Sequence, residues 1–398
     1  MKKIGLFLTP GPSTGGMFQY SLAILSALCE LPQDGFSLVV AYIDPFWDGY
    51  LSTHPVIRLP INPGRAARML AQSWIVSGAS LTLWRRWKPY FDPIVRAIVG
   101  QECDLWVFPG QDLWTSQLPV PMLAAVHDLM HRYQSKFLEA LGQVRYWYRE
   151  RYLGFTCRQA KGILVDSELG KHHVHESYGT PMEKLFVLPF VPPGYIYQNR
   201  PLLDFNERYQ LPPKYLFYPA QFWEHKNHAG LIRAIARLKK EFPEICLVLA
   251  GPKTNRYRKV VRLVETLGLQ HNVLFPGYIP ENDVPEFYRR ARALVLPTFF
   301  GPTNIPPLEA FALGCPVAAS RIYAMPEQVG DAALLFDPNS VEEMAYCISR
   351  LWSDDGICQL LISRGNRKAA SWSQPQFNRA LCTVVGQLMN CSAIESVA

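Results

Sequence analysis

The chain has 398 residues, of which 49% are hydrophobic and 18% charged, and its formal net charge is +7. At about 100 to 200 residues per domain, this length predicts two domains with sizeable cores. No run of about 18 uncharged apolar residues occurs, and the apolar part of residues 1–10 is too short for a secretory signal. We therefore expect a cytoplasmic protein, whose positive charge suits anionic substrates or an anionic membrane surface.

The nine cysteines are spread over the chain and most of them lie inside apolar runs. Their number is odd and no Cys-x-x-Cys pair occurs, so neither a disulfide framework nor a cysteine zinc site is indicated. We expect these cysteines to be reduced residues of the core.

The N-terminal stretch reads as a strand, a glycine-rich loop and a helix, over residues 3–8, 9–16 and 17–31. The loop has neither the Gly-x-Gly-x-x-Gly of dinucleotide-binding proteins nor the Gly-Lys-Ser/Thr of nucleoside triphosphatases. Hydride transfer and ATP hydrolysis therefore receive no support. Gly15 and Gly16 either let a ligand approach the backbone closely or only form a tight turn.

Strands and helices alternate along the rest of the chain, which predicts two parallel sheets. Residues 196–213 contain little periodicity and read as a linker between two domains. The predicted strands occupy residues 36–43, 104–108 and 121–126 before this linker, and 215–219, 246–250, 273–278, 291–296, 316–319 and 332–336 after it.

His127 and Asp128 follow the strand 121–126, at the end where open α/β sheets place ligand-binding side chains. His127 and His131 also have the spacing of a His-Glu-x-x-His zinc site, but that motif requires both histidines on one helix. A zinc hydrolase and a purely structural His127 remain alternatives. A second histidine group, His172, His175 and Glu176, reads as an exposed helix or a metal site.

Two stretches, residues 83–91 and 144–152, interleave arginines with tryptophan and tyrosine. This pattern is found at membrane interfaces, in nucleic-acid-binding segments and on ordinary surfaces where long side chains cover the core. We expect no nucleic acid as a partner, and keep a membrane surface and an ordinary surface as the alternatives.

The stretch 299–317 joins a buried strand to a helix through a sharp turn. Proline at 306 and 307 suits the first turn of a helix, and Gly314 can end it. Backbone N–H groups of Thr303, Asn304 and Ile305 would then gather at the start of this helix, where they favour a phosphate. Glu309, one turn further, is either a solvated residue or an acceptor for the ribose hydroxyls of a nucleotide.

This stretch, with its Pro-Leu-Glu-Ala and Gly-x-Pro-Val segments, resembles the donor-site signature of retaining glycosyltransferases of family 4 (group 1). The resemblance implies the α/β GT-B fold, in which two Rossmann-like, doubly wound domains face each other across a cleft. The domains would be 1–195, completed by a C-terminal helix at 372–398, and the donor-binding domain 214–371.

The resemblance also assigns roles to single residues. Lys226, followed by Asn227, matches the lysine that neutralises the donor diphosphate, a task for a compact cation. His127 would contact a sugar hydroxyl, with Asp128 orienting it. The other residues implied at the donor are Gly15, Gly16, Gly277, Tyr278, Thr303, Asn304, Ile305 and Glu309.

Two positions depart from the family pattern. Gly301 stands where the family has a first glutamate, which contacts the donated sugar, and Thr303 or Asn304 would have to replace that contact. Ala220-Gln221 stands where the family has Gly-Arg, so a second cation would come from Arg289 or Lys253.

The expected function is metal-independent, retaining transfer of a hexose from a nucleotide-diphosphate sugar, without a cofactor, to a glycan or lipid-linked acceptor in polysaccharide biosynthesis. The sugar would be mannose, from GDP, or a deoxyhexose such as rhamnose, and the enzyme would be cytoplasmic or peripheral on the inner membrane face. The alternatives are a nucleotide-sugar epimerase or hydrolase, and an inactive nucleotide-sugar-binding protein.

Overall fold

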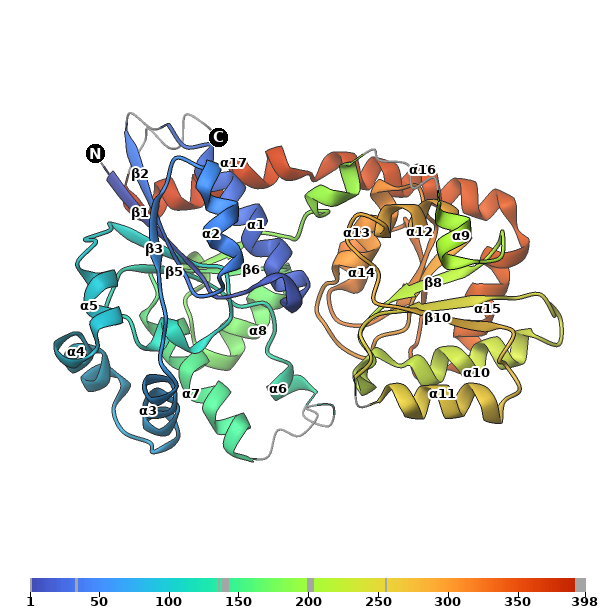
Figure 1. The fold of residues 1–398 in the computed structure, drawn as a ribbon, viewed down its shortest axis with the longest axis horizontal. Coiled ribbons are helices and arrows are strands. Elements are labelled where there is room, and N and C mark those ends of the chain that lie inside the picture. Colours follow the sequence, from blue (N-terminus) through green and yellow to red (C-terminus); the bar gives the residue numbers. More distant parts are fainter. Residues whose placement is uncertain are drawn as a thin grey trace. The chain divides into compact units, whose positions relative to one another are not determined.

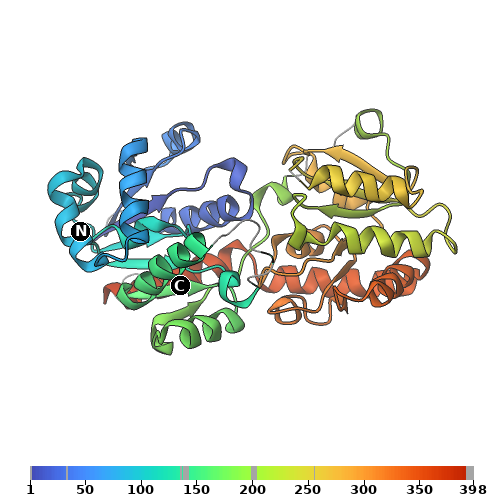
Figure 2. The ribbon, with the colours of Figure 1, turned by 90° about the horizontal axis from the view of Figure 1, so that it is seen from below.

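The computed structural model describes residues 2–32, 35–134, 137, 143–198, 204–254 and 256–390 (Figure 1). The chain forms two compact units, Met1–Phe190 with Gln374–Ala398, and Val191–Ser373. Each unit is a parallel sheet with helices packed on both faces (Figure 2). The predicted pair of Rossmann-like α/β domains is therefore confirmed.

The first unit has a seven-stranded sheet in the order β3-β2-β1-β4-β5-β6-β7, with all neighbours parallel. Its central β4 is uncharged and fully buried, as expected for a strand covered on both faces. The strands are β1 (Lys2–Leu8), β2 (Phe36–Tyr42), β3 (Ile57–Pro60), β4 (Leu105–Phe108), β5 (Met122–Ala125), β6 (Gly162–Val165) and β7 (Leu185–Val187).

The helices of this unit include the C-terminal α17, which packs on α1 through a hydrogen bond from Gln374 Nε2 to the Ala23 carbonyl at 3.0 Å. Residues 391–398 of the predicted C-terminal helix lie outside the described residues. The helices are α1 (Gly16–Cys29), α2 (Phe46–Tyr50), α3 (Arg65–Val76), α4 (Leu81–Phe91), α5 (Pro93–Val99), α6 (Met130–Tyr133), α7 (Gln143–Gln159), α8 (Glu168–Tyr178) and α17 (Gln374–Met389).

The second unit has a six-stranded parallel sheet in the order β10-β9-β8-β11-β12-β13. Its strands are β8 (Leu216–Pro219), β9 (Leu247–Ala250), β10 (Val273–Gly277), β11 (Ala293–Leu296), β12 (Val317–Ser320) and β13 (Ala333–Phe336). Its helices are α9 (Phe205–Tyr209), α10 (His228–Leu238), α11 (Tyr257–Thr266), α12 (Val284–Arg290), α13 (Ile305–Ala312), α14 (Met325–Val329), α15 (Val341–Ser353) and α16 (Asp355–Ser371).

The segment 196–213, treated as a linker in the sequence analysis, is part of the second unit in its described portion. Phe205 is buried there and packs on Phe287 with ring centroids 4.9 Å apart. The chain leaves the first unit at Phe190 rather than at residue 195. Apolar burial of α9 against the second core explains the difference, because a short helix carries little periodicity in the sequence. Residues 199–203 lie outside the described part.

Among the helices that fall within the described residues, none combines the length and the apolar character needed to cross a bilayer.

Gly5 of β1 provides a test of this packing. A Cβ atom at Gly5 would lie 2.2 Å from Trp106 Cδ2, and Trp106 is fully buried in β4. We expect Gly5→Ala to destabilise the protein by about 1–3 kcal/mol, because the indole has no room to move. Thermal unfolding followed by circular dichroism would measure it. Gly49→Ala, on the exposed side of α2 with no atom within 4 Å of the new Cβ, is the control. Equal melting temperatures for the two variants would contradict the packing argument.

Candidate functional site

The second sheet changes direction between β8 and β11. From β8 the order runs outward through β9 and β10, and from β11 it runs the other way through β12 and β13. In open α/β sheets, ligands bind at the carboxyl ends of the strands beside this switch point. The loop after β8 contains Lys226, and the loop after β11 leads to Glu309.

These two loops are joined to each other at His225. Its carbonyl accepts hydrogen bonds from the Phe299 N–H at 2.7 Å and from Thr298 Oγ1 at 3.2 Å. Its ring stacks on Phe300 with centroids 4.1 Å apart. Burial, with a smaller effect of neighbouring Lys226, lowers the pKa of His225 to about 3, so the ring is neutral. Lys226 is thereby fixed beside the loop that enters α13.

Lys226 ends a single turn of 3₁₀ helix, η7 (Glu224–Lys226), and its carbonyl accepts a hydrogen bond from Tyr218 Oη at 2.9 Å. The side chain is half-buried, and no carboxylate in the described part of the chain forms an ion pair with it. Burial lowers the pKa of its ammonium to about 8. A desolvated cation without a counter-ion favours an anionic ligand.

Asn227 was predicted to contact the donor, and the structure instead shows both ends of its side chain in use. It adopts a left-handed backbone conformation (φ 55°) and caps α10, with Oδ1 accepting from the Gly230 N–H at 3.1 Å. Nδ2 donates to the Pro338 carbonyl at 2.9 Å. Asparagine tolerates this conformation better than most residues. Its contribution is to hold the turn that presents Lys226.

The N-terminus of α13 offers an anion fewer backbone N–H donors than the sequence predicted. Asn304 is its N-cap, and the Asn304 N–H donates to Gln328 Oε1 at 2.9 Å. Gln328 Nε2 in turn donates to the Asn304 carbonyl at 2.7 Å. Asn304 therefore has no backbone N–H to offer a phosphate, which corrects the prediction. Since Pro306 and Pro307 have none, Ile305 is the first helical residue with a donor.

Gly301 has a backbone conformation (φ +107°) that side chains rarely adopt. A Cβ atom there would also lie 3.2 Å from Asn304 Nδ2. At this position the chain thus departs from the family pattern in its backbone conformation as well as in its side chain. A glutamate at Gly301 would be strained in this loop.

Glu309 is buried and held by two tyrosines from distant parts of the sequence. Oε1 accepts from Tyr195 Oη, and Oε2 accepts from Tyr288 Oη at 2.6 Å. Burial raises the pKa of Glu309, and the two hydrogen bonds oppose this shift. Each carboxylate oxygen can accept one more hydrogen bond. The sequence analysis missed both tyrosines, because they are 114 and 21 residues away and belong to no local motif.

Gly277 and Tyr278 lie at the carboxyl end of β10, two strands from β8 and on the same sheet edge. The Gly277 carbonyl accepts from the Gly251 N–H at 2.8 Å, and Tyr278 is exposed. At about 4.8 Å between strands, this position is roughly 10 Å along the edge from β8.

Two residues were considered as a replacement for the arginine that the family has at Gln221. Gln221 itself accepts a hydrogen bond from Trp223 Nε1 at 2.5 Å. Arg289 is paired with Glu286 at 3.5 Å. Lys253 is exposed in the loop after β9, the strand next to β8, and lies 5.1 Å from the centre of the Tyr257 ring. Its position on the correct sheet edge favours Lys253.

In the first unit, His127 follows β5 as predicted from the sequence. Its Nε2 lies 2.8 Å from the Pro109 carbonyl, so Nε2 carries the proton and Nδ1 is an acceptor. Burial lowers the pKa of His127, which keeps it neutral. Gln111 Oε1 accepts from the backbone N–H of His127 at 2.8 Å and of Asp128 at 3.1 Å. Gln111 was missed by the sequence analysis, since no local pattern links it to residue 127.

Asp128 was expected to orient His127, and the structure corrects this role. Its Oδ1 accepts from the Met130 N–H at 3.0 Å and pairs with Arg149 Nη2 at 3.2 Å. The carbonyl of Pro109 orients the imidazole instead.

Gly15 and Gly16 lie at the start of α1, where Gly15 is the N-cap with a positive φ of 62°. A Cβ atom at Gly15 would meet nothing within 4 Å, so open space adjoins this turn. A Cβ atom at Gly11, in the same loop, would lie 1.9 Å from Asp44 Oδ2, so the Asp44 carboxylate would have to move.

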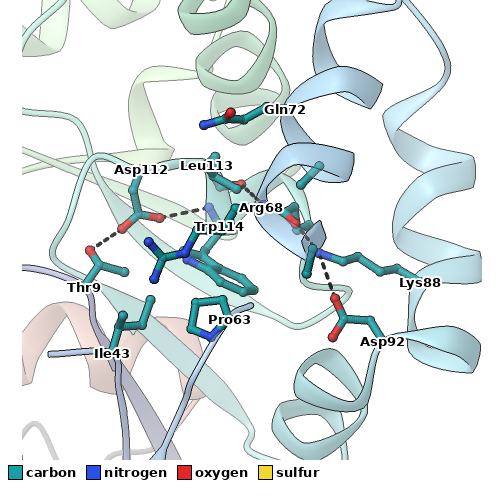
Figure 3. A pocket seen from close by; sticks show the side chains of 13 residues that line it. Thr9, Ile43, Pro63, Arg68, Gln72, Lys88, Asp92, Asp112, Leu113 and Trp114 are labelled. Atoms are coloured by element: carbon teal, nitrogen blue, oxygen red, sulfur yellow. Dashed lines mark hydrogen bonds and ion pairs between the residues drawn. The ribbon is translucent and has the colours of Figure 1, made fainter. Parts of the chain in front are cut away.

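A cavity of about 320 Å³ lies in the first unit, where β1, β2 and β4 end under α3 and α4 (Figure 3). Trp114 forms part of its wall, with Arg68 and Asp112 close by (Figure 3). Asp112 Oδ2 accepts from Thr9 Oγ1 at 2.5 Å and Oδ1 from the Trp114 N–H at 2.9 Å. Burial raises the pKa of Asp112 to about 6. Lys88 also lines the cavity. This cavity could not be predicted from local sequence patterns, because its wall comes from six separate segments.

The histidine groups considered as zinc sites are engaged elsewhere. His131 Nε2 lies 3.2 Å from Glu150 Oε2, and His175 Nδ1 lies 2.9 Å from the Thr180 carbonyl. Within the described residues, no three His, Cys, Asp or Glu side chains are grouped so that they could hold a metal ion.

Comparison with known proteins points to one family. Residues 199–368 match the model of glycosyl transferases group 1. The chain is 29% identical over 233 residues to O-antigen chain mannosyltransferase B of Escherichia coli, covering 57% of this chain and 60% of that protein. It is 24% identical over 349 residues to O-antigen chain mannosyltransferase RfbU of Salmonella typhimurium, covering 86% and 88%. It spans 22% of the serotype-specific mannosyltransferase WbdA of E. coli, at 24% identity over 44% of this chain.

Solved structures agree with the fold. The complex of Anabaena Alr3699/HepE with UDP and glucose has a TM-score of 0.75 at 16% identity, covering 97% of this chain and 100% of that one. WaaG, a glycosyltransferase involved in lipopolysaccharide biosynthesis, has a TM-score of 0.67 at 17% identity, with 97% and 99% covered. The chain thus has the GT-B fold, and its residues 199–368 match the model of the glycosyl transferases group 1 family.

Proposed function

We propose that this protein is a metal-independent, retaining hexosyltransferase that acts in polysaccharide biosynthesis. The observation that carries the proposal is Lys226, a partly desolvated cation that has no carboxylate partner among the described residues, at the switch point of the sheet that matches the family model. The substrate would be a nucleotide-diphosphate sugar. The names of the relatives favour mannose, and GDP would then be the leaving group.

In this reaction the bond from the anomeric carbon to the diphosphate oxygen breaks, and a bond to an acceptor oxygen forms on the same face of the sugar. The acceptor proton passes to the leaving diphosphate, so no protein base is required, and because attack occurs on the face that the diphosphate leaves, no protein nucleophile is required. Lys226 and the Ile305 N–H would stabilise the charge that develops on the diphosphate. Lys226 would thus supply the positive charge that a divalent metal provides in other transferases.

Glu309 and His127 would bind hydroxyl groups. The free acceptor sites on the Glu309 carboxylate suit the ribose of the donor, and His127 Nδ1 suits a hydroxyl of the transferred sugar. Lys253 would take the place of the missing arginine near the diphosphate.

The acceptor would be a glycan or a lipid-linked glycan, and the cavity of the first unit fits a sugar ring. Trp114 offers an apolar wall, and Arg68, Asp112 and Gln72 offer polar groups at its edge (Figure 3). Aromatic walls with a few fixed polar groups are typical of small-molecule sites. A lipid-linked acceptor would bring the enzyme to a membrane surface.

The donor assignment is tested first by binding. GDP, UDP, dTDP and ADP, each with its common sugars, should be compared by thermal shift with EDTA present. We expect one nucleotide to raise the melting temperature, and Lys226→Met to weaken its binding about 10- to 100-fold, because one charge-assisted contact is lost. Arg289→Met, which removes a cation already paired with Glu286, is the control.

Turnover then separates the candidate functions. Release of the nucleoside diphosphate from its sugar that depends on an added mannoside acceptor supports transfer, whereas equal release without acceptor supports a hydrolase. Tight binding without release supports the inactive protein. Absence of binding by every nucleotide would contradict the donor site.

Binding should also depend on pH through Lys226. Its pKa of about 8 in the free protein means that the ammonium loses its proton above pH 8. A bound diphosphate stabilises the charged form and raises the pKa, so binding above pH 8 takes up a proton. We expect affinity to be constant from pH 7 to 7.5 and to fall by up to about tenfold per pH unit above 8. Calorimetry in buffers of different ionisation enthalpy would detect the proton. A flat profile for the wild type would contradict this role, and Lys226→Met should be flat.

The role of Glu309 is tested through its tyrosine. Tyr195→Phe removes one hydrogen bond that lowers the pKa of Glu309. We expect nucleotide affinity to fall about three- to tenfold, and binding to be lost at a higher pH on acidification, because the carboxylate becomes protonated earlier. Exposed Tyr197→Phe is the matched control. Wild-type affinity in Glu309→Ala would show that this carboxylate does not contact the nucleotide.

A further inference from the structure

The segment from residue 61 to residue 100, which forms α3, α4 and α5, has an uneven charge. It contains six basic residues and one acidic residue, Asp92. Asp92 and Lys88 are both buried and paired with each other at 3.3 Å, so the charge imbalance comes from the other five basic residues. The basic residues are Arg65, Arg68, Arg85, Arg86, Lys88 and Arg96.

Helix α4 presents aromatic and aliphatic side chains to the solvent. Its inner side is formed by Leu81, Trp84 and Lys88, which are buried. Its outer side, here called the α4 face, consists of Leu83, Arg86, Trp87 and Tyr90. Leu83 is 54% exposed, Trp87 61% and Tyr90 76%. The spacing of these residues places them on one side of the helix. An ordinary surface helix would carry polar residues there.

Neighbouring helices also expose apolar side chains. Trp74 of α3 stacks on Trp84 of α4 with centroids 4.7 Å apart, so the two helices are side by side. Helix α3 exposes Met69 and Leu70. Arg151 of α7 donates to the Ala79 carbonyl between α3 and α4 at 2.6 Å, and the start of α7 exposes Val144 and Trp147.

We propose that the α4 face docks the protein on an anionic lipid bilayer. Tryptophan and tyrosine favour the interface between headgroups and acyl chains, and leucine favours the acyl region. Arg86 would reach anionic headgroups from the same face. Since no described helix can span a bilayer, the contact would be interfacial.

Two other occupants fit less well. Nucleic acid binding uses bases stacked on aromatic rings and phosphates on cations, and leaves no role for the exposed aliphatic residues Leu83, Met69 and Leu70. A second copy of the chain would bring the same excess of positive charge against itself. A membrane accounts for both the apolar groups and the charge.

The same helices also line the cavity described above. Lys88 on the inner side of α4 and Arg68 on α3 contribute to its wall. On the proposed function, a lipid-linked acceptor anchored in the bilayer would therefore lie near the helices that form this cavity. The docking itself does not depend on that function.

Vesicle flotation of the full chain tests the proposal. Vesicles of phosphatidylglycerol and phosphatidylethanolamine are compared with vesicles of phosphatidylcholine. We expect binding to the anionic vesicles that weakens with salt, and a loss of about tenfold in Trp87→Ser/Tyr90→Ser. Arg86→Gln should weaken binding and reduce its salt dependence. Tyr346→Ser, which removes a 62%-exposed tyrosine of the second unit, should bind like the wild type.

The replaced side chains are exposed, so melting temperatures should be unchanged. Absence of binding to anionic vesicles, or wild-type binding by the double variant, would overturn the proposal. It would also be overturned if the double variant abolished a dimer seen by sedimentation, or binding of a single-stranded oligonucleotide, while vesicle binding persisted. Nucleotide binding by the double variant, measured separately, keeps this test independent of the donor site.

Discussion

A half-buried cation without a carboxylate partner among the described residues is the constraint on which the candidate site of the second unit depends. Removing Lys226 from water has a free-energy cost that no ion pair offsets among the described residues, and the lowered pKa reflects that cost. The surroundings keep the side chain there: Asn227 caps the following helix, Tyr218 holds the backbone carbonyl, and His225 ties the turn to the next loop. Such an arrangement leaves a positive charge without an ion pair, and an anionic ligand can form that pair. It is a pattern typical of binding sites.

The loop after β11 differs from the family pattern in a way that reaches beyond one side chain. Gly301 adopts a backbone conformation in which a glutamate would be strained. The Asn304 N–H donates to Gln328 Oε1, so it is not available to an anion. Glu309 keeps its place because two tyrosines hold it, one of them from a segment that precedes the sheet. The candidate donor site therefore consists of Lys226, with Lys253 in the loop of the neighbouring strand, one helix N-terminus and a carboxylate held by tyrosines. A sugar with fewer hydroxyl contacts suits such a site.

The sequence was sufficient for features that are local. Alternating strands and helices, the order of loops, and the positions of Lys226 and His127 at strand ends follow from patterns within about ten residues. Contacts between distant segments could not be found this way. Tyr195 was assigned to the end of the first domain, Gln111 and Gln328 carry no motif, and Asp128 stood next to His127 in sequence but pairs with Arg149. Residues adjacent in sequence can be expected to interact, but the side chains that form hydrogen bonds and ion pairs are determined by the tertiary structure.

Helix α4 has one side buried against the first unit and one side exposed, and both sides carry aromatic residues. Its inner side buries Lys88, and the free-energy cost of burying this charge is offset by its interactions. The ammonium pairs with Asp92, donates to Gln117 and lies against the rings of Trp84 and Trp114. The inner side also buries Leu81 and Trp84, so α4 carries apolar residues on both sides, unlike an ordinary amphipathic helix. The exposed rings therefore have no folding role to explain them. The proposed bilayer interface accommodates aromatic and aliphatic side chains beside arginine, and it therefore accounts for the exposed side of the helix.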